Sequence, residues 1–304
     1  MTLSNDASSL ESPDILPAGQ LTPARIPWRM VGGRGIAAHL WRRFKNLVKQ
    51  PFYYLYLRRL RAKAQHWNHP RHLGVIMDGN RRYARESGLH DTLQGHHAGA
   101  EKVKEVLDWC YHLGIPVVTV WSFSVDNFQR STREVEGLLR LFEDKTREMA
   151  ASRQVHEHRV RIRYIGRLEM LPESLRQEIR RIEEMTAHYT QLQLNIAMAY
   201  GGREEITDAF KRYIAERVER GEKIDDILET FSDVSIEPYL YTSGQPEPDL
   251  ILRTSGEVRL SGFLLWQSAH SEFYFCETNW PAFREIDFLR ALRSYDERQR
   301  RYGR

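Results

Sequence analysis

The stretch HLGVIMDGNRR at residues 72–82 decides the fold of this chain, because it joins an apolar run to a polar turn. Residues 73–77 are apolar and flanked by turn-forming residues, which predicts a short buried strand. Asp78 and Gly79 form the turn, and Arg82 opens the helix expected next, whose N-terminus favours anions. A carboxylate at the end of a strand can hold a hard cation, and glycine lets the backbone approach a phosphate closely. Taken alone, these residues also fit an ordinary Asp-Gly turn with surface arginines.

Strand and helix patterns alternate from this stretch to residue 300. Further strands are predicted at residues 116–123, 160–165, 192–199 and 250–252. Helices are predicted at residues 103–113, 133–153, 173–188, 204–220 and 285–300. This order predicts a single α/β domain over residues 67–304, with a mostly parallel central sheet flanked by helices. In such sheets ligands bind at the carboxyl ends of the strands.

The composition is that of a globular protein with a sizeable core, since 41% of the 304 residues are hydrophobic and 28% are charged. The two cysteines, Cys110 and Cys276, lack C-x-x-C spacing, which disfavours a disulfide scaffold, a zinc site and a redox motif. The sequence has no run of about 18 apolar residues and no apolar signal segment after the first Met. We therefore expect a cytoplasmic protein.

The charge of the chain is unevenly distributed. Residues 15–77 contain 12 Lys and Arg and no Asp or Glu, so the net charge of +4 leaves 4 − 12 = −8 for the rest. Residues 1–24 show no periodicity, and we expect a disordered tail there. Residues 25–66 form a basic helical arm, with an amphipathic helix that ends near Pro51 and a second helix expected at residues 52–64.

Two interpretations of the basic arm stay open. It can pack on the α/β body with its charges in solvent, or it can make a peripheral contact at the inner face of the cell membrane. Basic faces that also carry Trp and Phe suit anionic headgroups. Nucleic-acid binding is disfavoured, because no nucleic-acid module follows the arm.

A second polar segment, FSVDNFQR at residues 123–130, follows the second predicted strand. Just after it, Ser131 has the position of a helix N-cap, with Glu134 at the capping-box position. Asn127 and Arg130 have no such structural explanation in the sequence. They are therefore candidates for a functional site.

The longest polar segment, residues 249–267, has two arginines six residues apart around a Ser-Gly turn. Arg253 and Arg259 can make bidentate contacts with phosphate oxygens, and Ser261 adds a hydroxyl. Glu272 follows shortly afterwards and is a second candidate carboxylate for a cation. Arg–Glu pairs of this kind also occur on ordinary protein surfaces.

The motifs of several other enzyme classes are missing. The sequence has no G-x-x-x-x-G-K-[ST], no G-x-G-x-x-G after a predicted strand and no G-x-S-x-G. Nucleotide hydrolysis, hydride transfer and serine hydrolysis therefore lose support.

Taken in order, the polar segments resemble those of the cis-prenyltransferase family, which includes the undecaprenyl diphosphate synthases. The resemblance covers residues 51–304. Residues 72–82 are similar to the first motif of the family, and GHHAG at residues 95–99 is similar to the second. Residues 123–130 resemble F-S-x-E-N-W-x-R. The run RTSGEVRLSGFLLWQ at residues 253–267 resembles the closing R-T-S-G-E-x-R-L-S-x-F-L-L-W-Q motif.

The resemblance implies a transferase that condenses isopentenyl diphosphate with an allylic diphosphate (geranyl, farnesyl or geranylgeranyl) to give a Z-polyprenyl diphosphate. It also implies Mg²⁺ dependence, a homodimer and an apolar tunnel for the product. A non-catalytic partner subunit of the same fold is disfavoured, because Asp78, Arg253 and Arg259 are all present. The two arginines also disfavour a reaction that couples two allylic diphosphates.

The same resemblance implies roles for individual residues. Asp78 would hold Mg²⁺ with help from Glu272, and Asn127 would act with Asp78 as a catalytic residue between the substrates. Substrate contacts are implied for Gly79, Asn80, Arg81, Arg82, Tyr83, His96, Ser124, Asn127, Phe128, Arg130, Arg253, Arg259, Ser261, Arg301 and Gly303. The last two belong to an R-x-G tail that, in relatives, reaches across a dimer to the diphosphate.

The chain also departs from the family pattern. Residues 81–83 read RRY where the family usually has G-R-W, and residues 89–93 lack the phosphate-binding arginine that many relatives carry. Ser122 is small where some short-product enzymes place a bulky residue, which allows a tunnel deeper than three isoprene units. Candidates for the tunnel wall, some of them expected to be ordinary core, are Val103, Val106, Leu107, Val135, Leu138, Leu139 and Phe142.

Overall fold

A computed structural model describes residues 53–302 of the chain, with side chains up to residue 299. The expected tail, the first helix of the basic arm and Gly303 lie outside these residues. The described part forms a six-stranded sheet with the order β3-β4-β2-β1-β5-β6, in which every neighbouring pair is parallel. The strands are β1 (His72–Ile76), β2 (Val117–Trp121), β3 (Val160–Ile165), β4 (Leu192–Ala197), β5 (Leu250–Arg253) and β6 (Glu272–Phe275). The predicted parallel α/β fold is confirmed, and β6 adds an edge strand.

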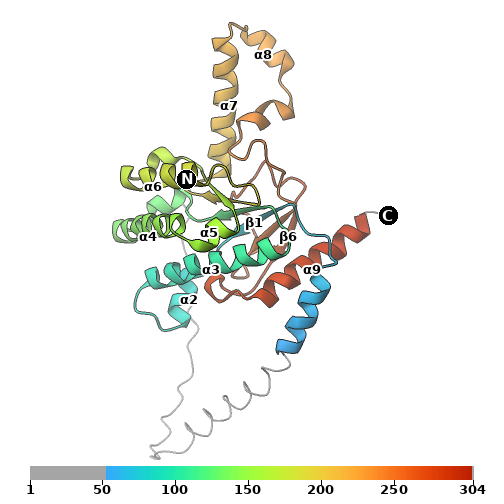
Figure 1. Cartoon of the computed structure of the whole chain (residues 1–304). Helices are drawn as coiled ribbons and strands as arrows, with labels where there is room; N and C mark the ends of the chain where they lie inside the picture. The colour runs from blue at the N-terminus through green and yellow to red at the C-terminus, as the bar shows by residue number, and fades with distance from the viewer. Residues whose placement is uncertain (1–52, 303–304) are drawn as a thin grey trace, which may run out of the picture. The chain divides into compact units, whose positions relative to one another are not determined.

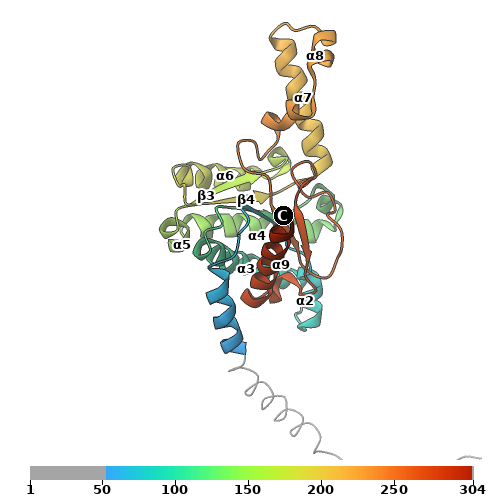
Figure 2. The same ribbon diagram turned by 90° about the vertical axis from the view of Figure 1, so that its right-hand side faces the viewer.

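Helices flank the sheet on both sides (Figures 1 and 2). The α-helices are α2 (Asn80–Glu86), α3 (Thr92–His112), α4 (Thr132–Ala150), α5 (Arg153–Glu157), α6 (Glu173–Thr186), α7 (Gly202–Glu219), α8 (Ile224–Thr230) and α9 (Glu285–Tyr302). The 3-10 helices are η1 (Val125–Gln129), η2 (Leu168–Met170), η3 (Asp233–Tyr239) and η4 (Trp280–Ala282). Helices α7 and α8 extend away from the sheet as a projecting pair.

Two predicted helices have a boundary that differs from the structure by three residues or more. α3 begins at Thr92, well before the predicted residue 103, because Asp91 caps it: the carboxylate accepts a hydrogen bond from the backbone N–H of Leu93 at 3.0 Å. The helix predicted at residues 133–153 is divided, because α4 ends at Ala150 and the short helix α5 follows after a break.

Strands β1, β2, β4 and β5 are buried on both faces almost throughout, which explains their runs of Val, Ile and Leu. All five residues of β1 are buried, including the polar His72. The two ring nitrogens of His72 lie 2.7 Å from the carbonyl oxygen of Pro246 and 2.7 Å from Thr119 Oγ1. Burial lowers the pKa of His72 to about 4, so the ring is neutral at pH 7.

The described end of the basic arm is a helix over residues 53–64, and it contacts α9, where Arg290 lies over the ring of Tyr56. Leu57, Leu60 and Ala64 are its buried side chains. Arg61 forms an ion pair with Glu285 at the start of α9. Within residues 53–302, no helix is long and apolar enough to cross a membrane.

Candidate active site

A cavity of about 620 Å³ opens at the carboxyl ends of β1, β2 and β5. Its mouth is lined by polar and charged side chains, and its interior is lined mainly by apolar ones, together with Lys145 of α4. The strand register explains why distant segments meet here: Ile76 of β1 pairs with Trp121 of β2 on one side and with Arg253 of β5 on the other. The polar segments that follow these strands therefore converge at one edge of the sheet, as expected for a parallel sheet.

Most of the site residues suggested by the sequence line this cavity. They are Asp78, Gly79, Asn80, Arg81, Arg82, His96, Ser124, Asn127, Arg130, Arg253, Arg259 and Ser261. Four separate segments of the chain therefore contribute to one site.

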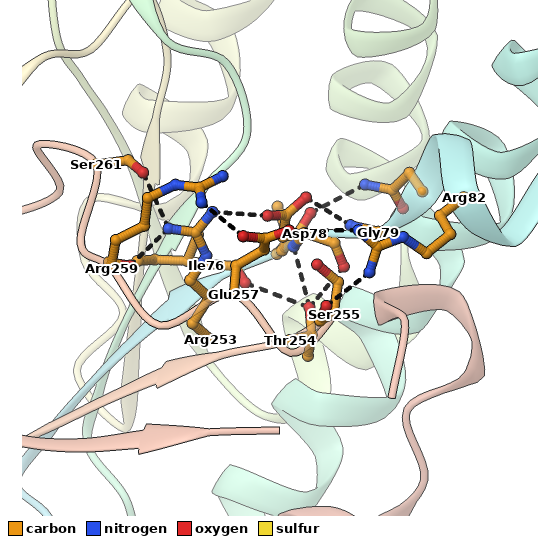
Figure 3. A network of polar contacts seen from close by, with 12 residues as sticks. Ile76, Asp78, Gly79, Arg82, Arg253, Thr254, Ser255, Glu257, Arg259 and Ser261 are labelled. Carbon is orange, nitrogen blue, oxygen red and sulfur yellow. Dashed lines mark hydrogen bonds and ion pairs between the residues drawn. The ribbon is translucent and has the colours of Figure 1, made fainter. Parts of the chain in front are cut away.

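Arg253 is the central cation of the mouth and only 4% of it is exposed. One guanidinium nitrogen, Nη2, donates to Asp78 Oδ2 at 2.7 Å, and the other, Nη1, donates to Ser261 Oγ at 2.9 Å (Figure 3). Nη1 also donates to the backbone carbonyl of Arg259. Its buried Nε has no hydrogen-bond partner among residues 53–302. Arg253 thus connects the first and last polar segments and keeps one donor unused.

The Asp-Gly turn after β1 is fixed by hydrogen bonds from Thr254 and by close packing around Gly79. The backbone N–H of Asp78 donates to Thr254 Oγ1 at 3.0 Å, and that hydroxyl donates to the carbonyl of Asp78 at 2.7 Å. Gly79 has φ = +99°, and a Cβ there would lie 2.5 Å from Asn279 Oδ1 and 2.9 Å from Ser255 Cβ. Only glycine fits this position, because both the backbone conformation and the available space exclude a side chain.

Glu257 places a carboxylate between two arginines of the mouth. Arg82 Nη2 donates to Glu257 Oε1 at 3.3 Å, and Arg259 Nη1 donates to Glu257 Oε2 at 2.5 Å (Figure 3). Arg82 also donates to the carbonyl of Ser255 at 2.7 Å. All three side chains of the Arg82–Glu257–Arg259 bridge are partly exposed to solvent. A diphosphate can therefore reach both arginines by replacing one carboxylate.

The two glycines of the GHHAG segment allow α3 to approach the start of α2. A Cβ on Gly95 would lie 2.2 Å from the carbonyl oxygen of Asn80, and a Cβ on Gly99 would lie 2.2 Å from Asn80 Oδ1. The amide of Asn80 in turn donates to the carbonyl of Met77 at 3.0 Å. These glycines therefore set the position of Asn80 at the cavity.

His96, between the two glycines, is half-buried in the cavity wall, with its Nε2 atom fully buried. Its Nε2 has no hydrogen-bond partner within the described residues. Burial, together with the nearby cations Arg130 and Arg81 and against the opposing carboxylate of Glu134, lowers the pKa of His96 to about 4. His96 is therefore neutral at pH 7.

Asn127 and Arg130 have structural partners that the sequence did not reveal. Asn127 Oδ1 accepts from the backbone N–H of Ser124, and Ser124 Oγ accepts from the N–H of Asn127, so the two residues form the capping box of η1. Arg130 Nη1 donates to Glu134 Oε1 at 3.0 Å. Ser131 occupies the N-cap of α4 but makes no side-chain capping bond. The capping box is therefore formed by Ser124 and Asn127 at η1, and not by Ser131 and Glu134 as predicted.

Five of the suggested residues are not placed at the cavity by the structure. Tyr83 lies on α2 but does not line the cavity. Phe128 does not line it either and packs edge-on against Phe123, with ring centroids 4.9 Å apart. Glu272 begins β6, where it pairs with Leu250 at the amino end of β5, so it lies at the opposite end of the sheet from Asp78. Its carboxylate accepts from Arg298 at 2.6 Å. The backbone of Arg301 is in α9, and Gly303 is outside the described residues.

Four residues of the mouth were not suggested by the sequence. Arg85 and Ser255 line the cavity, Thr254 holds the turn, and Glu257 bridges the arginines. Arg85 is three residues after Arg82 on α2, and this spacing puts both on one helix face, a signal that could have identified it. In the sequence, Arg85 also lies shortly before residues 89–93, the segment that lacks the phosphate-binding arginine of many relatives.

The mouth suits a magnesium ion bound together with a phosphate ligand. Within residues 53–302, no three His, Cys, Asp or Glu side chains gather closely enough to form a metal cage. Asp78 offers one partly exposed carboxylate beside several arginines. Mg²⁺ typically keeps several waters and binds through one or two carboxylates plus substrate phosphates, so one carboxylate at an arginine-rich mouth fits it.

The interior of the cavity is mainly apolar. Of the predicted wall residues, Val103, Leu138 and Phe142 line it. Val106 and Leu107 are buried in the core away from it. An extended apolar group attached to a diphosphate would therefore find a matching surface behind the polar mouth.

Comparison with known proteins agrees with this geometry. The family model described as putative undecaprenyl diphosphate synthase matches residues 76–303. The isoprenyl transferase of Thermus thermophilus is 52% identical over 257 residues, which cover 84% of this chain and 97% of the relative. The (2Z,6E)-farnesyl diphosphate synthase of Thermobifida fusca is 50% identical over 258 residues, covering 85% of this chain and 99% of that protein.

A solved structure is also similar. It is lavandulyl diphosphate synthase from Lavandula x intermedia in complex with dimethylallyl diphosphate, with a TM-score of 0.67 and 36% identity over 75% of this chain and 95% of that one. The family match covers most of the chain, and it includes the strand ends that form the cavity. The chain therefore belongs to the undecaprenyl diphosphate synthase family of cis-prenyltransferases.

Proposed function

We propose that this protein condenses isopentenyl diphosphate with an allylic diphosphate in a Mg²⁺-dependent reaction and releases a Z-polyprenyl diphosphate. The observation that carries the proposal is the single cavity, which joins a cationic mouth containing Asp78 to an apolar interior. Such a cavity matches both halves of an isoprenyl diphosphate. Each added five-carbon unit would gain about 4 kcal/mol from burial, at roughly 0.8 kcal/mol per carbon.

The two diphosphates would occupy different parts of the mouth. The allylic diphosphate would bind at the turn after β1, near Gly79, Asn80 and the arginines of α2, including Arg85. Isopentenyl diphosphate would bind Arg253, Arg259 and Ser261. Asp78 lies between the two groups and would hold the metal.

The reaction needs positive charge where the leaving diphosphate gains its negative charge. The bond between C1 and the diphosphate oxygen breaks, and its electron pair leaves with the diphosphate. The arginines of the mouth would stabilise this charge, and Mg²⁺ held at Asp78 would supply further positive charge. The double bond of isopentenyl diphosphate then forms the new carbon–carbon bond at C1, and loss of one proton restores a double bond. His96 is neutral at pH 7, so it would contribute through its unpaired Nε2 and not as a cation.

We also propose a homodimer, formed through the projecting pair α7–α8. Val218 of α7, Ile224 and Leu228 of α8, and Val234 of the following η3 are each more than half exposed. In a dimer, the tail with Arg301 and Gly303 would be available to the partner's mouth. Sedimentation velocity should give a dimer for the wild type and a monomer for Leu228→Glu, with Glu229→Gln as control. An unchanged dimer in Leu228→Glu would contradict the choice of surface.

A peripheral membrane contact is proposed for the described end of the basic arm. Tyr54 and Leu55 are 67% and 48% exposed, next to the exposed Arg58 and Arg59. Exposed aromatic and aliphatic groups beside cations suit an anionic lipid surface. Wild-type protein should float with phosphatidylglycerol vesicles more than with phosphatidylcholine vesicles, and Arg58→Glu/Arg59→Glu should reduce this. Equal flotation of both proteins would reject the contact.

The deciding experiment is a product assay with labelled isopentenyl diphosphate, Mg²⁺ and geranyl, farnesyl or geranylgeranyl diphosphate in turn. Wild-type protein should extend at least one starter. Asp78→Ala should abolish extension while the circular dichroism spectrum stays unchanged. Absence of extension with every starter, in folded wild-type protein, would reject the proposal.

A further inference from the structure

The inner end of the cavity is formed by one row of side chains across three neighbouring strands. Val120 of β2, Ile196 of β4 and Tyr164 of β3 are register partners, and all three line the cavity. The next row lies two residues back along each strand, about 6.6 Å deeper. It consists of the register partners Val118, Leu194 and Ile162. These residues are fully buried in the core and do not line the cavity, so the cavity ends at the first row.

Tyr164 is the largest side chain of this row and is held at both ends. Its backbone belongs to β3, and its hydroxyl lies 2.7 Å from Thr146 Oγ1 on α4. Thr146 donates its own proton to the carbonyl of Phe142 at 2.7 Å, so the Tyr164 hydroxyl is the donor in the pair. The Thr146–Tyr164 pair therefore spans the distance from the sheet to α4.

The anchor point on α4 lies between two residues of the cavity wall. Phe142 precedes Thr146 by one helical turn and Met149 follows it by three residues, and both line the cavity. The ring of Tyr164 thus crosses the space between the sheet and α4 at the inner end. It is 94% buried, and turning it aside would leave the Thr146 hydroxyl pair broken in an apolar setting.

We propose that Tyr164, positioned by Thr146, sets the length of the product by closing the cavity behind the row Val120–Ile196–Tyr164. The inference rests on the proposed condensation reaction. The diphosphate stays at the arginines of the mouth, so each condensation pushes the far end of the hydrocarbon chain one five-carbon unit inward. Growth stops when that end meets the ring, because the ring, bonded to Thr146, occupies the space between the sheet and α4.

The test compares the products of wild-type, Tyr164→Ala and Tyr164→Phe enzymes, after removal of the diphosphate, by chromatography and mass spectrometry. Tyr164→Ala should shift the main product by at least one five-carbon unit. Tyr164→Phe should keep the wild-type length, since the ring remains. Tyr164→Leu is the substitute if the alanine variant does not fold, and it should also give longer products. Ile162→Ala is the matched control, on the same strand and the same face but one row deeper, and should leave the length unchanged.

Each other outcome counts against the inference. Active Tyr164→Ala and Tyr164→Leu enzymes with the wild-type product length would mean that the chain passes the row elsewhere. Longer products from Tyr164→Phe would assign the limit to the hydroxyl pair and overturn the role of the ring. An equal increase of product length in Ile162→Ala would show that the longer products come from loosened core packing and not from removal of the ring. Failure of the proposed function is distinguishable, because the wild type would then make no extended product at all.

Discussion

At the scale of single residues, the mouth of the cavity is organised by charged side chains that bind each other before any diphosphate is present. Arg253 binds Asp78, and Glu257 binds Arg82 and Arg259. These pairs keep the arginines aimed at one place, which reduces the reorganisation needed when an anion binds. They also mean that substrate binding replaces existing contacts.

Replacing Arg253 by Lys should lower kcat/KM for isopentenyl diphosphate about 100-fold. A lysine has no planar fork, so it cannot reach Asp78, Ser261 and a phosphate at the same time. Loss of two charge-assisted hydrogen bonds at about 1.5 kcal/mol each accounts for this factor. Steady-state kinetics would measure it, with the exposed Arg161→Lys as control. A variant with nearly wild-type kcat/KM would show that Arg253 acts only as a point charge.

Replacing Glu257 by Gln should strengthen the binding of inorganic diphosphate about two- to fivefold. The carboxylate competes with the ligand for Arg82 and Arg259, and exposed ion pairs of this kind are worth roughly 0.2–1 kcal/mol. Isothermal titration calorimetry in the absence of Mg²⁺ would measure the change, with Glu229→Gln on α8 as the control. Weaker binding would instead identify Glu257 as a support that the arginines need.

At the scale of secondary structure elements, the close approach of α2 and α3 positions the first polar segment. The approach depends on Gly95 and Gly99, which face Asn80 at the start of α2. Both glycines lie inside a 21-residue helix, where glycine is unfavourable by about 1 kcal/mol relative to alanine. Their presence is explained by the contact and not by helix formation.

Replacing Gly95 by Ala should therefore destabilise the protein and reduce activity, although alanine favours the helix. The new Cβ would lie 2.2 Å from a backbone oxygen, which cannot move without shifting α2. We expect a loss of about 1–3 kcal/mol in the free energy of unfolding, as for other overpacked sites. Gly137→Ala in α4 is the control, because its Cβ would meet only the flexible end of Leu93. Denaturant unfolding of both variants would measure the difference; equal stability would show that α2 adjusts freely.

At the scale of the whole molecule, stability should depend on pH through buried histidines. The folded-state pKa of His72 is about 4, below its usual value of 6.5, because burial disfavours the charged ring. Between these two values the unfolded chain binds more protons than the folded one. The stabilisation is therefore complete above pH 6.5 and is lost as pH falls towards 4. The shift of roughly 2.5 pKa values corresponds to about 3 kcal/mol.

Denaturant unfolding of wild type and His72→Gln between pH 7.5 and pH 4 would test this dependence. Glutamine can keep hydrogen bonds to the neighbours of His72 and does not titrate in this range. As pH falls, the wild type should lose about 3 kcal/mol of unfolding free energy relative to the variant. The same difference at every pH would mean that the ring is protonated without cost in the folded protein.

The sequence by itself determined the class of fold and most of the residues that form the mouth. Alternating strand and helix patterns require a parallel sheet, and in a parallel sheet the segments after the strands lie at one edge. Asp78, Arg130 and Arg253 could therefore be grouped without coordinates. Arg85 was within reach of the same reasoning, since helical spacing places it on the face of Arg82.

Only the tertiary structure decided which residues meet across strands and helices. Glu272 was grouped with Asp78, but the register of β5 and β6 places it at the other end of the sheet. The sequence offered no structural role for Asn127, yet its side chain completes the capping box of η1. Tyr164 read as one more strand residue, and its place at the inner end of the cavity depends on the register of β3 with β4 and on Thr146 of α4. The physical reason is that periodicity sets the face and the end of each element, whereas strand order, register and helix packing set its neighbours.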